Sequence, residues 1–441
     1  MNKLINFIRD ALKHKINRDI MWTLGSFFVL AASGVLMNII IVIFRDAASL
    51  GIFNLSYAVY LIGSQVAVIG IHNSVMRYTA YHSENIVERG AMLASAMSIT
   101  LLFGIMFGGG IYMAEPWIAK IFGSEESAEA IAYTGFGLML FPINKVLISY
   151  INGLRHMRAL SLLQTTRYLT VLAGIAIVSI SSLSFTYATW SFFIAEALTI
   201  ISVLVYMGKA GLLKHLSISS KWIRSHLEFG FKGALGSILL DMNTRVDVLL
   251  LGVFLSESDV GVYSFAAMVI DGLQHILSML RVNFNPILVT ALRDKDWKQA
   301  QQLLHYSKIY VFLGTLALAL LVIPCFYIFV EYFIANKELV EGWKVLAILF
   351  GSYVIISGFT PFDNLLLASG HPAYQTIQNM SIAIVNIILC FLLIPTFGII
   401  GAAISTALSY ITGIAIMLIL SYLLLGWNML SNTTPAKESG K

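Results

Sequence analysis

Charged and amide side chains lie inside apolar segments of this sequence, where each must be paired or hydrated. One such segment contains the run Asp241-Met-Asn243-Thr-Arg245-Val-Asp247. At about 100° per residue, Asp241 and Arg245 share one helical face, whereas Asp247 points away from it. This pair either merely tolerates burial or belongs to a polar wall that faces a water-filled cavity. Asn243 and Asp247, which the pair does not neutralise, favour the polar wall.

Further ionisable residues lie in other apolar segments. Asp271 and His275 are four residues apart and can face the same side of a helix, and Arg281 lies about two and a half turns further on. Lys145 and Asp363 stand at corresponding depths in two other segments. A charge near the bilayer centre costs about 2.5–3.5 kcal/mol, so each of these groups needs a partner or a polar cavity.

Two of the basic residues also have a simpler interpretation. Arg77 follows His72 and Asn73 at a segment end, and Lys145 lies little more than one turn from one. Long basic side chains at such positions can reach the membrane interface without binding anything. The candidate substrate-binding residues are Arg77, Lys145, Asp241, Asn243, Arg245, Asp247, Asp271, His275, Arg281 and Asp363.

These residues lie within a series of about twelve apolar runs, and short polar connections join one run to the next. Each run has roughly twenty residues, the length that an α-helix needs to cross a hydrocarbon core of about 30 Å. The predicted spans are 20–44, 50–72, 91–113, 131–151, 160–182, 187–207, 231–255, 260–285, 310–333, 343–368, 376–396 and 398–425. The sequence therefore predicts an all-α, polytopic membrane protein.

Basic residues concentrate in every second connection. Most of the 28 Lys and Arg residues lie in one set of connections: the N-terminus, loops 73–90, 152–159 (continuing to Arg167), 208–230, 286–309 and 369–375, and the C-terminus. The opposite set of connections holds only Arg45, Lys120, Lys337 and Lys344. The positive-inside rule then places both termini in the cytoplasm, which requires an even number of crossings.

The sequence also repeats itself. Residues 50–53 (Leu-Gly-Ile-Phe) match residues 260–263 (Val-Gly-Val-Tyr), and Pro142-Ile-Asn144 matches Pro361-Phe-Asp363 further on. Six spans per half give both halves the same orientation, so they are parallel repeats around a central cavity. The predicted parts are an interfacial amphipathic segment 1–19, lobes 20–216 and 217–425, and a cytoplasmic tail 426–441.

The composition excludes other classes of protein. A chain with 58% hydrophobic and 12% charged residues does not form a soluble fold. The net charge of +5 follows from the basic loops, so we expect no nucleic-acid partner. Cys325 and Cys390 lie inside apolar runs, and we expect no metal site, cofactor or catalytic residue.

Several motifs resemble those of the bacterial polysaccharide-biosynthesis flippases. They are residues 245–252, 256–266, 394–403, 50–53 and 73–78. The resemblance covers nearly the whole chain and points to the polysaccharide transporter branch of the multidrug/oligosaccharidyl-lipid/polysaccharide flippase superfamily, with O-antigen flippases as the nearest kind.

The resemblance implies a function in the bacterial inner membrane. Such a protein turns a polyprenyl-diphosphate-linked oligosaccharide from the cytoplasmic to the outer leaflet by alternating access, for example in lipopolysaccharide O-antigen assembly. It would use no cofactor, but coupling to an H⁺ or Na⁺ gradient is compatible with it. Partner proteins would be a polysaccharide polymerase and chain-length machinery.

Two other functions remain open at this point. A drug or cation antiporter of the multidrug and toxin extrusion type would need an acidic residue deep in the first span, but Ile20 to Phe44 contains no charge. A membrane glycosyltransferase or O-antigen ligase would need a large catalytic loop, and no predicted connection exceeds about 25 residues.

We predict twelve crossings with both termini in the cytoplasm. Cysteines introduced at Ser124 and Ser219 in a cysteine-free variant should differ in reactivity toward a membrane-impermeant thiol reagent added outside the cell. Ser124 should be labelled and Ser219 protected, because they lie on opposite sides. Equal labelling of both from outside contradicts the topology.

Overall fold

Helices form nearly all of the structure, as predicted. The computed structural model describes residues 15–334 and 336–431, with the side chains of 15–20 and 233–243 left out. Most of the predicted interfacial segment 1–19 and most of the predicted tail 426–441 therefore lie outside the described residues. The chain divides into unit 1, Met1–Asp241, and unit 2, Met242–Lys441. The predicted lobe boundary at 216/217 stays a prediction.

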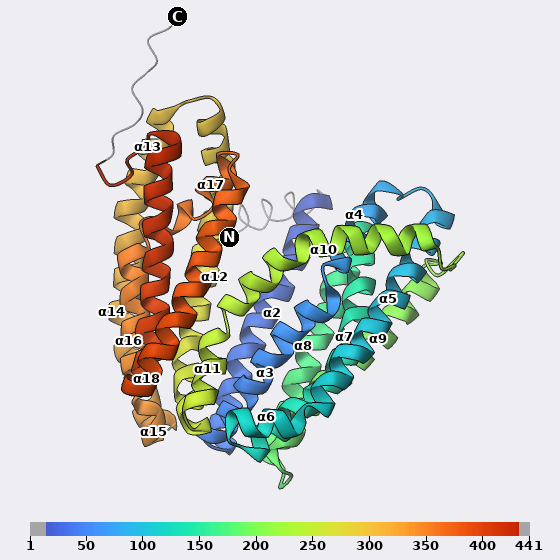
Figure 1. Ribbon diagram of the computed structural model, residues 1–441, viewed down its shortest axis with the longest axis horizontal. Coiled ribbons are helices and arrows are strands. Elements are labelled where there is room, and N and C mark those ends of the chain that lie inside the picture. Colours follow the sequence, from blue (N-terminus) through green and yellow to red (C-terminus); the bar gives the residue numbers. More distant parts are fainter. Residues whose placement is uncertain (1–14, 335, 432–441) are drawn as a thin grey trace, which may run out of the picture. The chain divides into compact units, whose positions relative to one another are not determined.

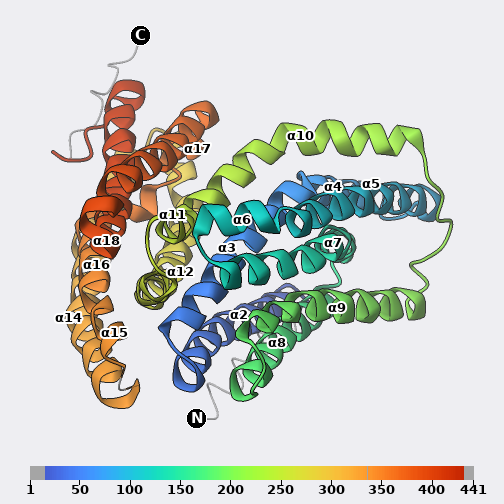
Figure 2. The same ribbon diagram turned by 60° about the horizontal axis from the view of Figure 1, so that its bottom comes forward.

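Unit 1 is built around one long helix. This helix, α7, packs against α3, α4, α5 and α9, which lie around it in Figure 2. The elements are α2 Lys15–Phe44, α3 Ala47–Val68, α4 Ile71–Tyr81, α5 Ile86–Met113, α6 Glu115–Phe122, α7 Glu125–Gly153, α8 Met157–Ile180, the 3₁₀ helix η1 Phe185–Thr189, α9 Trp190–Lys209 and α10 Ser220–Asn243.

Unit 2 contains more interrupted helices. Short 3₁₀ and π-helical turns join or break its longer elements. They are α11 Val246–Phe254, α12 Glu257–Arg293, α13 Trp297–Tyr306, η2 Ser307–Val311, α14 Phe312–Ile328, η3 Phe329–Ile334, α15 Lys337–Val340, α16 Gly342–Ile356, η4 Thr360–Phe362, α17 Leu365–Ala368 and α18 Pro372–Leu425.

The number of membrane crossings agrees with the prediction. Among the described residues, 10 helices are long and apolar enough to cross a membrane. One of them, α18, has 54 residues, or about 80 Å at 1.5 Å per residue, so it is long enough for two crossings. The broken pair α10 and α11 occupies the remaining predicted span. The count is therefore about twelve.

The two crossings of α18 form an antiparallel hairpin that turns at Gly398. This glycine has φ 57° and ψ −137°, a conformation that residues with a Cβ rarely adopt. Beyond the turn, a Cβ on Gly401 would meet the Leu393 carbonyl oxygen at 2.2 Å, and one on Gly413 would meet Ile382 at 2.4 Å. Small residues therefore let the two arms, visible in Figure 1, pack closely.

Two predicted spans are not continuous helices. The span predicted at 231–255 breaks at Thr244 and Arg245, and just after the break the Asp247 carboxylate accepts from the Val248 backbone N–H, a local bond of the kind that competes with helix formation. The span predicted at 343–368 ends as an α-helix at Ile356 and passes through a turn containing Pro361, which has no backbone N–H. Both corrections concern segments that carry candidate residues.

The first turns of α10 are fixed to α4 and α5 of unit 1. The Trp222 indole donates to Glu88 at 2.7 Å, and the buried His226 bridges the Ser74 hydroxyl and the Met92 carbonyl. Burial lowers the pKa of His226 to about 4, so the ring is neutral at pH 7 and supplies one donor and one acceptor. These hydrogen bonds hold the first turns of α10 against α4 and α5, within unit 1 and before the point where unit 2 begins.

Gly230 marks the closest approach of this contact. A Cβ at Gly230 would meet the Ile69 carbonyl oxygen at 2.4 Å, and one at Gly70 would meet the Gly230 carbonyl oxygen at 2.8 Å. Ile69 and Gly70 both have positive φ, which forms the bend between α3 and α4. Backbone therefore packs directly on backbone at this point.

We predict that Gly230→Ala weakens the packing of α10 on the bend between α3 and α4. The added methyl group cannot be accommodated without shifting backbone, so amide hydrogen exchange of residues 219–232 should accelerate by at least about tenfold. Gly208→Ala is the matched control, because a Cβ there has open space and alanine favours helix. Unchanged exchange in Gly230→Ala would show that the close approach does not hold the helix.

Candidate functional site

A polar stripe runs along α12 in unit 2. Asp271, Gln274, Ser278, Arg281 and Asn285 follow one another at spacings of three and four residues, which places them on one helical face. All five are partly buried, between the packed face and the exposed face of the helix. The predicted Asp271 and Arg281 therefore belong to one continuous polar surface within a membrane helix.

Asp271 is paired with Arg245. The Arg245 guanidinium donates to Asp271 Oδ2 at 3.1 Å, and the two side chains are 21% and 39% exposed. Arg245 lies at the break between α10 and α11 and has extended φ of −138°, so the break directs it toward α12. The helical pairing predicted for Arg245 with Asp241 assumed an unbroken helix, and the Asp241 side chain lies outside the described residues.

A second ion pair lies further along the stripe. Arg281 donates to Asp363 Oδ2 at 3.0 Å, and the Gln378 amide donates to Asp363 Oδ1, also at 3.0 Å. Asp363 directly follows the 3₁₀ turn η4, which comes after α16. Two candidate residues from spans that are distant in the sequence are thus brought together, with about 30% of each side chain exposed.

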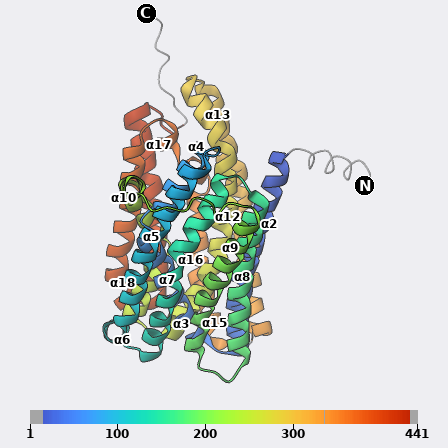
Figure 3. The same cartoon turned by 90° about the vertical axis from the view of Figure 1, so that its right-hand side faces the viewer.

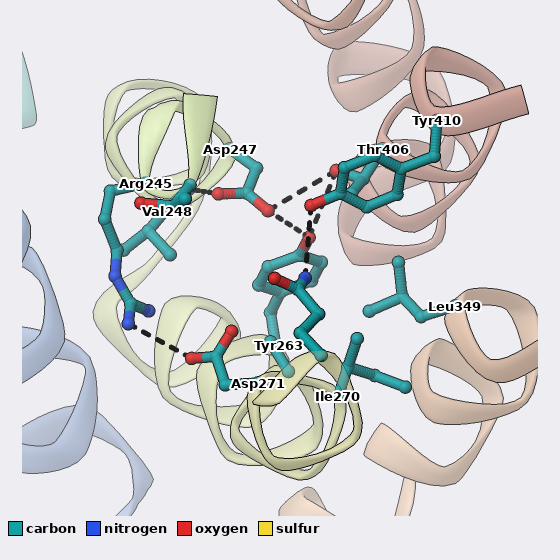
Figure 4. A pocket seen from close by; sticks show the side chains of 12 residues that line it. Arg245, Asp247, Val248, Tyr263, Ile270, Asp271, Leu349, Thr406 and Tyr410 are labelled. Atoms are coloured by element: carbon teal, nitrogen blue, oxygen red, sulfur yellow. Dashed lines mark hydrogen bonds and ion pairs between the residues drawn. The ribbon is translucent and has the colours of Figure 1, made fainter. Parts of the chain in front are cut away.

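Asp247 lies in a small pocket beside these pairs. It accepts hydrogen bonds from the Val248 amide at 2.8 Å, the Tyr263 hydroxyl at 2.5 Å and the Thr406 hydroxyl at 3.4 Å (Figure 4). The residue is only 7% exposed. The pocket has a volume of about 30 Å³, which suits a single water molecule or ion and is far too small for a sugar.

Unit 1 has a separate polar centre around Glu196. This fully buried carboxylate accepts from the Tyr60 hydroxyl and from Arg167, both at 2.6 Å, and from the Asn144 amide. A neighbouring pocket of about 70 Å³ is lined in part by Lys145 and Arg167. Lys145 thus lies beside a buried ion pair rather than only at a helix end.

The remaining candidates lie apart from these groups. His275 is exposed and does not line the Asp247 pocket. Arg77 is also exposed, with its guanidinium 5.4 Å from the Tyr81 ring and 5.2 Å from the Phe229 ring. Asn243, like Asp241, has a side chain outside the described residues, so its predicted role is not tested.

Arg167 is a residue that the sequence reasoning missed. We assigned it to a basic loop, although it lies inside the predicted span 160–182 and within α8. Glu196 lies in the next predicted span, 187–207, and is its partner. The sequence signal for this pair was an arginine and a glutamate, each inside one of two consecutive predicted spans.

Sequence profiles of two families match the chain. The profile described as polysaccharide biosynthesis protein matches residues 16–292, which is more than half of the sequence. The profile described as MatE matches residues 234–392. No curated protein matches the sequence.

Solved structures of several transporters are similar to the chain. The lipid II flippase MurJ in an inward closed conformation has a TM-score of 0.73 and 15% identity, over 94% of this chain and 90% of that one. An inward-facing multidrug resistance MATE family transporter of the MOP superfamily has a TM-score of 0.71 and 14% identity, over 93% and 96%. A MOP superfamily transporter from Pyrococcus furiosus has a TM-score of 0.56 and 13% identity, over 90% and 93%. At these identities the likeness concerns the fold.

Proposed function

Because the chain belongs to the polysaccharide biosynthesis protein family, we propose that it is a flippase for a polyprenyl-diphosphate-linked oligosaccharide. The substrate moves from the cytoplasmic to the outer leaflet of a bacterial inner membrane, for assembly of an O-antigen-like surface polysaccharide. The family match carries this proposal. The protein itself is a multi-pass membrane protein with a transporter fold.

The α12 stripe supplies the chemistry that such a substrate requires. A diphosphate needs cationic partners, and arginine offers two parallel hydrogen bonds to phosphate oxygens. Arg245 pairs with Asp271 and Arg281 pairs with Asp363, so each arginine is neutralised by a carboxylate. A diphosphate would therefore take the place of Asp271 beside Arg245 or of Asp363 beside Arg281, so that the arginine keeps an anionic partner and the displaced, partly exposed carboxylate is hydrated. This exchange is possible because all four side chains are partly exposed.

Other candidate residues would bind the glycan and line its path. Asn243 and His275 have groups that hydrogen-bond to sugar hydroxyls, while Arg77 and Lys145 are cations of unit 1. The prenyl tail stays in the lipid. Rocking of the two halves about a central cavity would carry the polar headgroup across.

The runner-up is a drug or cation antiporter. The MatE profile match over residues 234–392 favours this class, because it covers α11 and the whole α12 stripe. The first span argues against it, since α2 contains no acidic residue between Met21 and Phe44. The export experiment that follows separates the two, because an antiporter does not affect surface glycan.

We predict that glycan export depends on Arg245 as a substrate contact. In a deletion strain, Arg245→Ala should lower surface glycan by about tenfold and accumulate the lipid-linked precursor, because a charge-assisted hydrogen bond is lost. Arg245→Lys keeps the positive charge but loses the two parallel hydrogen bonds of the guanidinium. Its surface glycan level should therefore lie between those of the parent protein and Arg245→Ala. Surface glycan and precursor are measured at matched protein levels.

A double variant distinguishes this role from a purely structural one. If the pair serves only folding, Asp271→Ala together with Arg245→Ala removes the unpaired charge and should restore export. Continued loss in the double variant supports substrate binding, whereas near-normal export contradicts it. Removing the exposed Arg224–Glu228 pair on α10 is the matched control and should leave export unchanged.

We further propose that Asp247 binds the coupling cation, H⁺ or Na⁺. Its carboxylate is buried and accepts only from neutral donors in the hydrogen bonds described for it. The Thr406 hydroxyl and the Asn386 amide oxygen, 3.5 Å apart, add oxygen atoms nearby. A buried carboxylate without a cation costs free energy, so a proton or Na⁺ ion at this site stabilises the protein.

We predict that the purified protein is stabilised by one of these cations through Asp247. Replacing K⁺ with Na⁺ should raise the melting temperature by a few degrees if Na⁺ binds, and lowering the pH in K⁺ should do so if H⁺ binds. The stability gain should vanish in Asp247→Asn, which keeps the side-chain size. Equal responses of Asp247→Asn and the parent protein contradict the assignment.

A further inference from the structure

The helix that begins with α13 is too long for the membrane alone. α13, η2, α14 and η3 follow one another without a break from Trp297 to Ile334, a length of 38 residues. At 1.5 Å per residue this is about 57 Å, against a hydrocarbon core of about 30 Å. Its first turns therefore extend into the headgroup region or beyond. α13 lies at the same end of unit 2 as α17 (Figure 3).

One face of this long helix is packed and the other is open. Ala300, Leu304, Ser307 and Val311 are buried at helical spacing and hold the helix on unit 2. On the opposite face, the exposed residues change in character along the axis. Near the start they are polar, such as Lys298 and His305; then come the exposed rings of Tyr306 and Tyr310; and then the exposed apolar Leu313, Leu320 and Leu321.

This order matches the layers of a lipid leaflet. Tyrosine favours the boundary between hydrocarbon and headgroups, lysine favours the headgroup side, and leucine favours the acyl chains. The two tyrosine rings lie 4.6 Å apart at the π-helical turn Ser307–Val311, which widens the helix at that level. The face is therefore built to contact lipid from the headgroup inward.

A groove lies at the polar end of this face. It has a volume of about 480 Å³ and is shallow and widely open to the outside. The described residues that line it are Lys298, Gln301, Gln302, His305, Tyr306 and Tyr310. They offer one ammonium group, an imidazole, two amides and two hydroxyls, and no carboxylate. Such a set favours an anion that accepts hydrogen bonds.

We propose that this groove binds the phosphate headgroup of an anionic phospholipid. Lys298 provides the charge, the tyrosine and glutamine groups donate hydrogen bonds, and the acyl chains follow the apolar face toward Leu320. The occupant is a lipid rather than a soluble anion because the groove continues directly into the lipid-facing part of the helix. A lipid held here fixes the depth of α13 and α14 in the membrane.

Lipid binding by the purified full chain tests this proposal without any transport assay. The protein, reconstituted in nanodiscs that contain phosphatidylglycerol or only phosphatidylcholine, is analysed by native mass spectrometry for retained lipid. Phosphatidylglycerol should be retained preferentially, and Lys298→Gln should weaken this retention by about fivefold, as expected for one basic residue near an anionic surface. Retention of phosphatidylcholine should not change.

Matched variants separate the groove from general charge effects. Lys337→Gln removes the same charge from an exposed lysine outside the groove and should leave retention unchanged. His305→Gln keeps a hydrogen-bonding group and should have a smaller effect than Lys298→Gln. Equal retention by Lys298→Gln and Lys337→Gln overturns the proposal. Displacement of the lipid by millimolar inorganic phosphate also overturns it, because the groove would then be a site for a soluble anion.

Discussion

The cost of placing a charge in hydrocarbon governs the polar interior of this protein. A single unpaired charge costs several kcal/mol there, a large part of the stability of a domain. Arg167 with Glu196, Arg245 with Asp271 and Arg281 with Asp363 each place opposite charges within 3.1 Å. Asp247 is instead surrounded by hydroxyl and amide donors. The helix break at Arg245 and the 3₁₀ turn just before Asp363 each lie next to one of these pairs.

The two sequence repeats can be compared at these ion pairs. Asn144 and Asp363 occupy matching positions after a proline in the two repeats, and both belong to an ion-pair centre. In unit 1 the asparagine donates to Glu196, whereas in unit 2 the aspartate itself is the anion. At matching sequence positions, unit 1 thus has a neutral amide and unit 2 a carboxylate, and the arginine comes from α8 in unit 1 and from α12 in unit 2.

The sequence predicts those features that depend on local composition. Segment length and hydrophobicity predicted the crossings, and the intramembrane charges predicted that polar centres exist. Partner identity depends on the packing of distant helices, so Arg281 with Asp363 could not be derived from spacing. The pairing of Asp241 with Arg245 relied on a continuous helix, and the break at Thr244 removes that basis. Arg45, counted only as a basic residue on the outer side, donates to the carbonyl oxygens of Val178, Ser179, Ser181 and Leu183 at the end of α8.

Fold similarity does not separate a flippase from an antiporter, because both kinds of structure resemble this chain to nearly the same degree. The distinction rests on charge. A cation antiporter needs an anion where its substrate binds, whereas a lipid-linked diphosphate needs cations. Arg281 on the α12 stripe and Arg245, which pairs with Asp271 of the stripe, have carboxylate partners that are partly exposed, while α2 is uncharged from Met21 to Phe44. A diphosphate that takes the place of Asp271 or Asp363 frees a carboxylate, just as a drug cation that displaces a guanidinium frees an arginine, so the ion pairs by themselves serve either kind of substrate. The uncharged first span and the polysaccharide biosynthesis profile over residues 16–292 are what favour an anionic, lipid-linked substrate.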